Sequence, residues 1–368
     1  MRLIIAIGIV LLLYSIQSRL YRKYWKRGLD VTLSFSRDTA DIGEELSLTE
    51  VITNRKSLPL PILHVKFYTA RSFLFSDNQN AQTTDHYYRN DVFSILGNQK
   101  ITRQLTFQTT HRGYFAIDSL QITSKDLFLM RTFATSLENR TYLYVLPAII
   151  HGTAFDTVKD KILGDMHANG QGPEDPYAFC GIRAYQTYDS MKHINWKATA
   201  HTGTLMVNQY QPAISDEVCI LLNMTPYSKS GADALQEHAI NIAHSLGLAF
   251  MEHAIDVSLY TNGCDILSKA QPCLMRGHGT EHQMSLSRLL SRLDIRQKCT
   301  SFTEMMRTHL QDGSHRIRYI IISTYRDDAL LSIFESICPR TDAYWIIPEY
   351  PSADIRYDNR NIIKWSLI

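Results

Sequence analysis

An apolar run near the N-terminus, followed at once by a basic flank, constrains this chain more than any other feature. Leu3 to Ile16 is apolar except at two positions, and five Lys or Arg residues follow by position 27. A bilayer core needs about 20 residues of helix, so the run spans it only if Leu20 and Tyr21 are drawn in while Arg19 snorkels. No small-x-small cleavage site follows the run, which disfavours a signal peptide. We therefore predict an uncleaved membrane anchor over residues 1–27.

The charges around the run predict its orientation. Basic residues are retained on the cytoplasmic side of a membrane, and the five that follow the run outweigh Arg2 before it. We therefore expect a single-pass protein of the cell membrane whose folded part lies in the cytoplasm. The six cysteines form no CxxC pair, and we interpret them as free thiols of a reducing compartment, which agrees with that location.

Length and charge narrow the classes of protein further. A chain of 368 residues is too long for one ordinary domain, so two folded units are expected. The 38 basic and 36 acidic side chains leave a formal net charge of only +2. Such a balance gives no global attraction to nucleic acid, and no nucleic-acid partner is predicted.

Residues 28–150 have the pattern of an all-β domain. Apolar and polar residues alternate over Leu29 to Phe35, and again over Ile101 to Phe107, as strands with one buried face require. Further short alternating segments lie between turn-rich pieces, and no helical period of useful length intervenes. We predict an antiparallel β-sandwich of immunoglobulin-like shape, in which residues 75–92 form a long exposed loop. Residues 151–180 are rich in Gly and Pro and are predicted to be a linker.

Residues 181–368 have the pattern of an α/β domain. Val218 to Leu222 is continuously apolar, as in a strand buried on both faces. A helix capped by Ser230 is expected next. Helical and strand patterns then alternate: strand 256–260, helices 281–293 and 302–310, strand 318–323, helix 328–337 and strand 344–347. This order predicts a parallel, doubly wound sheet, whose ligand sites lie beyond the carboxyl ends of its strands.

The densest stretch of charged and aromatic residues runs from Gly181 to Pro212. Its candidate signature and interaction residues are Arg183, Tyr185, Asp189, Asn195, Trp196 and Lys197. Arg183, Asp189 and Lys197 could bind an anion or act in catalysis, but a charged pair beside a stacked tryptophan also joins domains. We favour the junction, in which Trp196 and Ile194 would each bury apolar area that stabilises the fold by about 2 to 3 kcal/mol.

This stretch resembles the signature of a bacterial family named domain of unknown function 58. The resemblance rests on Arg183-x-Tyr185, on the run Ile194-Asn195-Trp196-Lys197-Ala198 and on Leu205-Met206-Val207. It continues at His111 to Phe115 in the first domain, although Asp126 to Leu129 replaces the proline and glycine expected there. The resemblance implies that the second domain is similar to a von Willebrand factor A domain. It also implies a partner, an AAA+ ATPase of the MoxR type.

Domains of the von Willebrand A type commonly bind magnesium after their first strand through an Asp-x-Ser-x-Ser loop. The matching positions are Asn223, Thr225 and Tyr227. Loss of the carboxylate removes most of the attraction for a cation, and a tyrosine would crowd the site. We therefore predict no metal and no cofactor, and we interpret the loop as a neutral surface for protein contact.

A second possible metal site is the short run from His278 to His282. It matches H-x-x-E-H, in which two histidines one helical turn apart bind zinc and the glutamate acts as base. Gly277 and Gly279 bracket the first histidine, so the helix that would align the two imidazoles has not begun there. We interpret the run as a loop at the start of a helix.

Three hypotheses of function follow. The first is a non-enzymatic, membrane-anchored interaction platform that works with a MoxR-type ATPase in the assembly or maintenance of a membrane or envelope complex. The second is a metal-dependent ligand-binding or adhesion module with an atypical site at Asn223 and Thr225. The third is an unrecognised zinc hydrolase that uses His278, Glu281 and His282.

Overall fold

A computed structural model of the protein describes residues 2–76, 81–83, 87–168, 174–186, 189–212, 217–225, 232–297, 300–310, 317–325, 327–338, 343–350, 359 and 361–366. The chain divides into two compact units. The first, the strand-rich unit, consists of residues 1–148 and 290–293. The second, the mixed-sheet unit, consists of residues 149–289 and 294–368.

The N-terminal run is helical. Helix α1 (Arg2–Tyr24) continues well beyond Ile16, and its part Leu3–Tyr24 is long and apolar enough to cross a membrane by length and composition. Most of its large apolar side chains up to Leu20 are exposed. Ser18, Tyr21 and Trp25 are buried, because they recur at one helical face and this face packs against the strand-rich unit.

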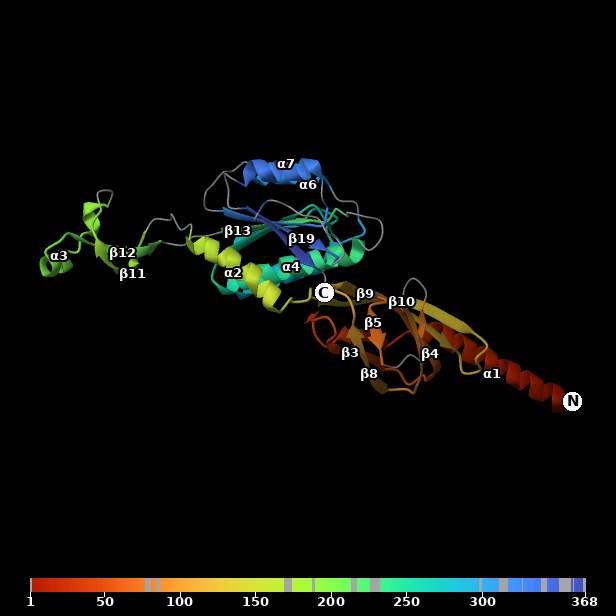
Figure 1. The fold of residues 1–368 in the computed structure, drawn as a ribbon. Coiled ribbons are helices and arrows are strands. Elements are labelled where there is room, and N and C mark those ends of the chain that lie inside the picture. The colour runs from red at the N-terminus through yellow and green to blue at the C-terminus, as the bar shows by residue number, and fades with distance from the viewer. Residues whose placement is uncertain are drawn as a thin grey trace. The chain divides into compact units, whose positions relative to one another are not determined.

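The strand-rich unit contains two sheets (Figure 1). Its strands are β1 (Leu29–Phe35), β2 (Thr39–Ala40), β3 (Glu45–Asn54), β4 (Leu60–Thr69), β5 (Phe73–Phe75), β6 (Ala81–Thr83), β7 (Tyr87–Ile95), β8 (Gln99–Thr109), β9 (Gly113–Lys125) and β10 (Thr132–Val145). One sheet has the order β1-β3-β8-β5 and the other the order β2-β10-β9-β4-β7-β6. Neighbouring strands are antiparallel except for the short parallel pair of β2 and β10.

The alternation seen in the sequence places the core of this unit. Along β3 every second residue is buried, including Leu48 and Ile52. The same alternation holds for the buried residues at the C-terminal ends of β4, β8 and β9. Side chains of both sheets join one apolar cluster, to which α1 contributes Tyr21 and Trp25. The strands predicted around Leu29, Leu46, Val65, Ile101 and Phe115 are therefore present.

Residues 75–92 were expected to form a long exposed loop, and that expectation is wrong for its described part. Strand β7 begins at Tyr87, and the side chains of Arg89 and Asp91 point inward and are fully buried. The sequence pattern did not indicate this strand, because charged residues occupy the inward positions where apolar residues are expected. Arg89 donates from Nε to Asp91 at 2.8 Å, and Arg103 of β8 donates to the other carboxylate oxygen at 2.9 Å.

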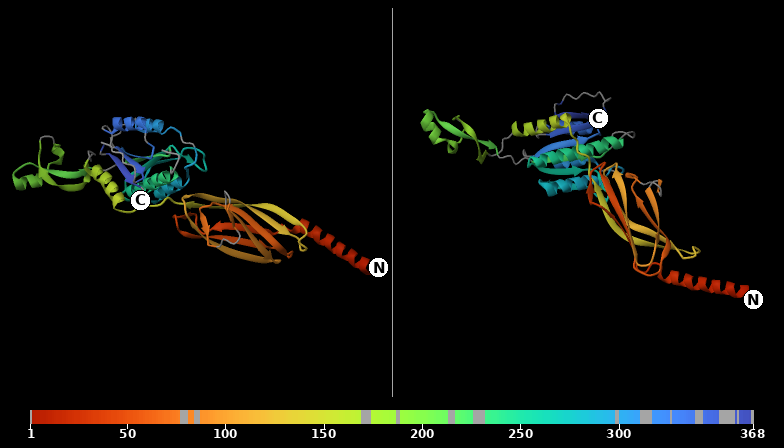
Figure 2. Two further views of the ribbon diagram at one scale, coloured as in Figure 1. Left: turned by 45° about the vertical axis from the view of Figure 1, so that its right-hand side comes forward. Right: turned by 90° about the horizontal axis from the view of Figure 1, so that it is seen from below.

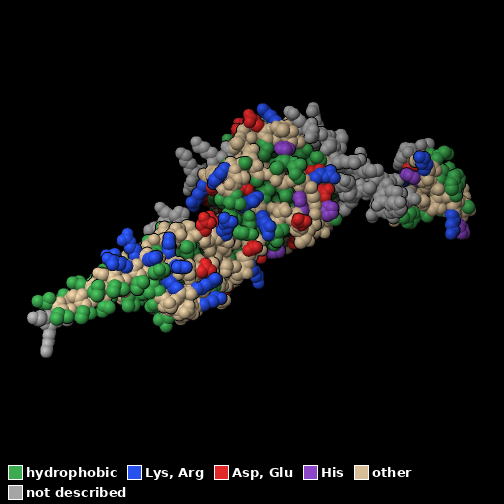
Figure 3. Space-filling view, turned by 180° about the vertical axis from the view of Figure 1, so that it is seen from behind, with side chains coloured by type: hydrophobic (Ala, Val, Ile, Leu, Met, Phe, Trp, Pro, Cys, Tyr) green, Lys and Arg blue, Asp and Glu red, His purple; other side chains and the backbone are tan. Residues whose placement is uncertain are grey.

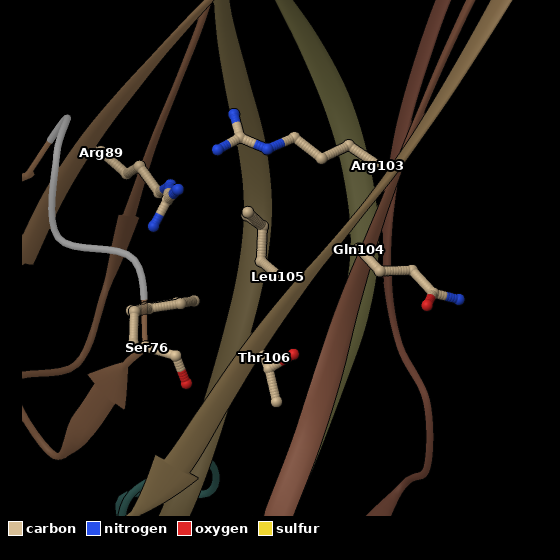
Figure 4. A pocket seen from close by; sticks show the side chains of 7 residues that line it. Ser76, Arg89, Arg103, Gln104, Leu105 and Thr106 are labelled. Carbon is tan, nitrogen blue, oxygen red and sulfur yellow. The ribbon is translucent and has the colours of Figure 1, made fainter.

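These side chains form a charged cluster inside the strand-rich unit, completed by Glu50 of β3. Arg89 and Arg103 both line a cavity of about 140 Å³ (Figure 4), and the Arg89 guanidinium also lies over the ring of Phe75. Neither carboxyl oxygen of Glu50 has a hydrogen-bond partner. Burial raises the pKa of Glu50 from 4.5 to about 8, and the nearby Asp91 carboxylate acts in the same direction. Glu50 is therefore mostly protonated at neutral pH.

The mixed-sheet unit begins with α2 (Thr153–Ala168). Its other elements are β11 (Glu174–Ala184), the 3-10 helix η1 (Met191–His193), α3 (Trp196–Thr202), β12 (Met206–Pro212), β13 (Glu217–Asn223), α4 (Ala232–Glu252), β14 (Asp256–Thr261), β15 (Cys264–Asp265), β16 (Cys273–Gly277), α5 (Thr280–Ser291), β17 (Leu293–Asp294), α6 (Phe302–Leu310), β18 (Ile317–Ser323), α7 (Asp328–Ile337), β19 (Ala343–Glu349) and β20 (Ile362–Ser366). Of these, Leu290 to Leu293 are assigned to the strand-rich unit.

A six-stranded sheet of order β16-β14-β13-β18-β19-β20 forms the centre of this unit. All neighbours are parallel except β16, which is antiparallel to β14. The chain moves from β13 to β14 on one side and from β18 to β19 on the other. Helices α6 and α7 pack on one face of the sheet, while α4 lies across the other (Figures 1 and 2). The predicted alternation of strands and helices in this half is confirmed.

One expected linker differs from the structure. Residues 151–180 were predicted to be a linker because of their glycines and prolines, yet 16 of them form α2. Phe155, Ile162, Leu163 and Met166 recur on one face of this helix and are buried. Four apolar side chains at helical spacing were enough to outweigh a composition typical of loops. The glycines at 170 and 172 lie outside the described residues.

We expect Glu50→Gln to remove a pH dependence of stability. Below about pH 4.5 the folded and unfolded chains both carry the proton, but between pH 4.5 and 8 the unfolded chain loses it while the folded chain keeps it. The free energy of unfolding of the wild type should therefore fall as pH rises, by on the order of 3 kcal/mol between about pH 5 and 8 relative to the variant. Thermal denaturation across this range measures the difference. Parallel curves for the two proteins would contradict a protonated Glu50.

Candidate functional site

The stretch with the signature residues folds as a small element of its own. Strands β11 and β12 pair with each other in antiparallel register and with no strand of the six-stranded sheet in the part of the chain that is described. The chain between them forms η1 and α3. We call β11, η1, α3 and β12 the signature element.

Arg183 and Asp189 form the main polar contact of this element. The Arg183 guanidinium donates to both carboxylate oxygens of Asp189, at 2.7 and 2.6 Å. The backbone N–H of Gln186 also donates to Asp189, at 2.7 Å. These donors, Arg183 first, lower the pKa of Asp189 and keep it ionised. The pair thereby ties β11 to the chain that leads into η1.

Asn195 connects the helix of the signature element to its sheet. Its side chain caps α3 by accepting the N–H of Ala198 at 2.9 Å, and its amide donates to Asn208 of β12 at 2.7 Å. Its backbone N–H donates to the carbonyl of Met206. Ile194 before it is buried. At the other end of α3, Gly203 takes the left-handed conformation that ends many helices, with φ of 72°.

Trp196 is not buried, which corrects the expectation that it joins a domain junction. The Trp196 side chain is 69% exposed, because the cap at Asn195 places it on the outer side of the first turn of α3. Lys197 is exposed as well, so it does not complete a cluster with Arg183 and Asp189. Tyr185 is half-buried, and its backbone N–H donates to the carbonyl of Leu205.

The signature element therefore presents apolar side chains to solvent while its polar residues bond to each other. The exposed fraction exceeds 40% for Phe179, Ile182, Met191, Trp196 and Leu205. Hydrophobic side chains gather on this element, at the right of Figure 3. Lys192 and Lys197 of the same element are also exposed. Exposed apolar surface of this kind is typical of protein-binding sites.

A second candidate site lies at the carboxyl edge of the six-stranded sheet, where the strand order reverses. Asn223 ends β13 opposite Ser323, which ends β18, and the Asn223 amide donates to the Ser323 hydroxyl at 2.9 Å. Asn262 follows the neighbouring strand β14 and is fully buried. Its amide nitrogen lies 3.1 Å from Asn223 Oδ1, 2.9 Å from Thr225 Oγ1 and 3.1 Å from the carbonyl of Thr300.

The side-chain amide of Asn262 hydrogen-bonds to the oxygens that a cation would need as ligands. Three acceptors converge on the Nδ2 of Asn262, while its Oδ1 accepts the N–H of Met224 at 2.7 Å and so fixes which end of the amide faces them. Asn223 Oδ1 also accepts the N–H of Thr225. No group of three or more His, Cys, Asp or Glu side chains suited to a metal occurs among the described residues. The oxygens that converge here belong to an amide, a hydroxyl and a backbone carbonyl, whereas a hard cation prefers carboxylate ligands. They therefore suit the amide N–H donor of Asn262 better than a cation. Tyr227 lies outside the described residues.

A cavity of about 600 Å³ opens beside this network. It is lined by Thr225, Ile295, Arg296, Gln297, Thr300, Ser301, Phe302, Thr303, Tyr325, Asp327 and Leu330. These residues follow β13, β17 or β18, or lie at the starts of α6 and α7. The cavity therefore occupies the position at which open parallel sheets bind ligands, and hydroxyl, amide and charged groups line it.

The H-x-x-E-H run is held by separate contacts. Helix α5 begins at Thr280, so His278 precedes it, as expected for a loop at the start of a helix. His278 hydrogen-bonds to Asp256 through Nδ1. His282 lies on the helix, and its Nε2 lies 2.9 Å from the carbonyl oxygen of Val257. The two imidazoles thus use ring nitrogens for different partners.

The comparison with protein families agrees with the resemblance described above. Residues 181–332 match the family described as Protein of unknown function DUF58. The matched range covers the end of β11, all of α3 and β12, the amide network and most of the sheet. It supports the DUF58 family for this part of the chain, and the description of the family gives no activity.

Other comparisons add less. No curated protein matches the chain. Among solved structures, a non-cellulosomal cohesin from Archaeoglobus fulgidus is 15% identical, with 32% of this chain and 91% of that chain covered and a TM-score of 0.23. The sixth cohesin of scaffoldin B from Acetivibrio cellulolyticus is 12% identical, with 31% of this chain and 98% of that chain covered and a TM-score of 0.23. Spo0M, a sporulation control protein from Bacillus subtilis, is 10% identical, with 43% of this chain and 58% of that chain covered and a TM-score of 0.19. Likenesses at these TM-scores support no further argument.

We expect Asn262→Ala to destabilise the mixed-sheet unit. The substitution leaves Asn223 Oδ1, Thr225 Oγ1 and the Met224 N–H without this partner in a buried site, so unfolding should become easier by about 3 kcal/mol. The matched control is Gln271→Ala, which removes an exposed amide that also contacts Thr300. Thermal melting compares the two. A loss below about 1 kcal/mol for Asn262→Ala would indicate that water replaces the amide.

Proposed function

We propose that the protein is a non-enzymatic interaction platform anchored in the cell membrane by α1. The proposed partner is a MoxR-type AAA+ ATPase, and the proposed role is assembly or maintenance of a membrane or envelope complex. The ATPase and this role come from the family resemblance. The platform itself rests on one observation, which is the exposure of Trp196 and Met191 on the signature element.

Helix α1 supports the anchor. It is one continuous apolar helix of 23 residues, and its exposed apolar side chains have no other solvent suited to them than lipid. The basic residues from Arg19 to Arg27 support an orientation with the folded units in the cytoplasm. Cys219, Cys273 and Cys338 are free thiols, which fits a reducing compartment.

The finer fold belongs to the same proposal. We propose that the two sheets of the strand-rich unit form an immunoglobulin-like sandwich, since side chains from both join one apolar cluster. We propose that the mixed-sheet unit is related to von Willebrand factor A domains, since its parallel strands alternate with helices on both faces. Such domains bind partners at the carboxyl edge of the sheet, where the cavity lies here.

The contacts within the signature element support its role in binding. Arg183 hydrogen-bonds to Asp189, while Asp189 and Asn195 each accept a backbone N–H group nearby. These three residues therefore stabilise the fold of the element. Trp196 and Met191 contribute little to its stability, because 69% and 73% of their surfaces remain in contact with water. Large exposed Trp and Met side chains are costly in solvent and are typical of interface centres, so a partner surface accounts for both.

A ligand-binding module is the second candidate, and the cavity beside Thr225 favours it. The hydrogen bonds of Asn262 argue against the metal-dependent form, because an amide nitrogen occupies the position between the oxygens. A magnesium titration followed by thermal melting distinguishes the two forms. A stabilising shift that disappears in Asn223→Ala would favour the metal-dependent module over the platform.

We expect Trp196→Ser to weaken partner capture without lowering stability. The side chain is mostly exposed, so the melting temperature should change little, while loss of an interface tryptophan typically costs 2 kcal/mol or more of binding energy, roughly a thirtyfold loss of affinity. The matched control is Met275→Ser on β16, which is 67% exposed. The measurement is recovery of AAA+ ATPase by affinity purification of the full chain from membranes.

Two results would count against the platform. Repeated purification of the wild type that recovers no ATPase of this class would remove the proposed partner. Equal recovery by the wild type and Trp196→Ser would place the partner surface elsewhere on the molecule.

A further inference from the structure

The turn between β9 and β10 presents four consecutive apolar side chains to solvent. Leu127, Phe128, Leu129 and Met130 are 53%, 51%, 47% and 75% exposed. Turns at the tips of hairpins normally carry Gly, Pro, Asn or Asp, because these residues suit tight backbone and water. We call Leu127 to Met130 the apolar tip. Its composition requires an apolar environment that the rest of the strand-rich unit does not supply.

The apolar tip is held in a defined shape. Asp126 is buried, and its Oδ1 accepts the N–H groups of Met130 at 2.8 Å and Arg131 at 3.1 Å. Its backbone bonds with Leu129 and Arg131 close the turn. Leu129 has a φ of 60°, in the left-handed region that favours glycine. A leucine at this position carries a backbone strain that glycine would avoid.

The hairpin that carries the tip runs beside α1, in the same unit. Trp25 stacks on Phe133 of β10 with ring centroids 5.8 Å apart, and Tyr14 lies 6.1 Å from Phe128. The two ring contacts lie at different points along the helical segment and along the chain that leads from the turn into β10, so the two segments run alongside each other. Both views of Figure 2 place this turn next to the helix.

The depth of the tip follows from its neighbour on the helix. Tyr14 belongs to the apolar run and precedes Arg19, the first basic residue after it, by five residues. Five residues of helix rise about 7.5 Å. If Arg19 marks the interface between headgroups and lipid chains, a side chain beside Tyr14 lies well inside that interface. Figure 3 shows the apolar surface of the helix, with Lys and Arg gathered where the helix meets the strands.

We propose that the apolar tip inserts into the bilayer beside α1, on the side of the membrane that faces the folded units. This proposal rests on the membrane anchor proposed above. Lipid is the occupant that fits, because the tip contacts the apolar run of a membrane-spanning helix. The exposed side chains of Arg19, Arg22, Lys23 and Arg131 also lie at the level where anionic headgroups would be. Two attachments at different points then fix the tilt of the strand-rich unit on the membrane.

Photo-crosslinking of the full chain tests the insertion. Phe128→benzoylphenylalanine places a photoreactive ring in the tip, and Leu11→benzoylphenylalanine places one in the anchor. The control is Leu74→benzoylphenylalanine, since Leu74 is 57% exposed and pairs with Gln108. Gln108 lies about 30 Å along β8 from Gln99, which is the end of that strand nearer to the apolar tip. The proteins are reconstituted in vesicles of phosphatidylethanolamine and phosphatidylglycerol, irradiated and analysed by mass spectrometry.

The expected result is the mass shift of a phospholipid adduct at positions 11 and 128 and none at position 74. An adduct at position 11 without one at 128 would overturn the insertion and leave the anchor standing. Absence of adducts at both 11 and 128 would overturn the anchor and the insertion together. Adducts at 74 as strong as those at 128 would indicate general adsorption of the unit and would also overturn the insertion.

Discussion

The packing of α1 into the core of the strand-rich unit is the constraint on which the remaining arrangement depends. Tyr21 and Trp25 are both buried in the same apolar cluster as the inward residues of both sheets, and the Tyr21 hydroxyl donates to the carbonyl of Pro59 at 2.8 Å. No flexible linker therefore separates the apolar helix α1 from the sheets of the strand-rich unit, and the packing fixes the direction in which the helix leaves that unit. In the proposed anchored state, that direction sets how the unit meets the bilayer.

Polar side chains have two different roles in the second unit. At the carboxyl edge, Asn262 holds Asn223 and Thr225 through neutral hydrogen bonds and makes a rigid edge without charge. In the signature element, Arg183 and Asp189 hold the backbone from which Trp196 projects. Both networks consist of hydrogen bonds among their own side chains and the local backbone, and each one shapes the surface beside it.

The sequence correctly predicted the elements in which apolar residues recur at regular spacing. It missed the features that depend on buried charged residues or on contacts between distant parts of the chain. Helices α6 and α7 were placed at their observed bounds because their apolar residues recur at helical spacing. Strand β7 was missed because Arg89 and Asp91 occupy inward positions and neutralise each other. The exposure of Trp196 could not be predicted, because it depends on where the Asn195 cap directs the first turn. Asn262 follows a strand without any motif, and only the pairing of β13 with β14 brings it to Asn223.

The burial of Tyr21 and Trp25 has a practical consequence for producing the protein without its exposed apolar run. The basic flank ends at Arg27, so residue 28 is the boundary that charge and hydropathy suggest. A chain that starts there lacks two aromatic side chains of the core, and each such loss typically destabilises a domain by about 3 to 5 kcal/mol. A chain that starts near Gln17 keeps both aromatic residues while omitting most of the exposed apolar run. The boundary of the strand-rich unit thus lies inside the helix.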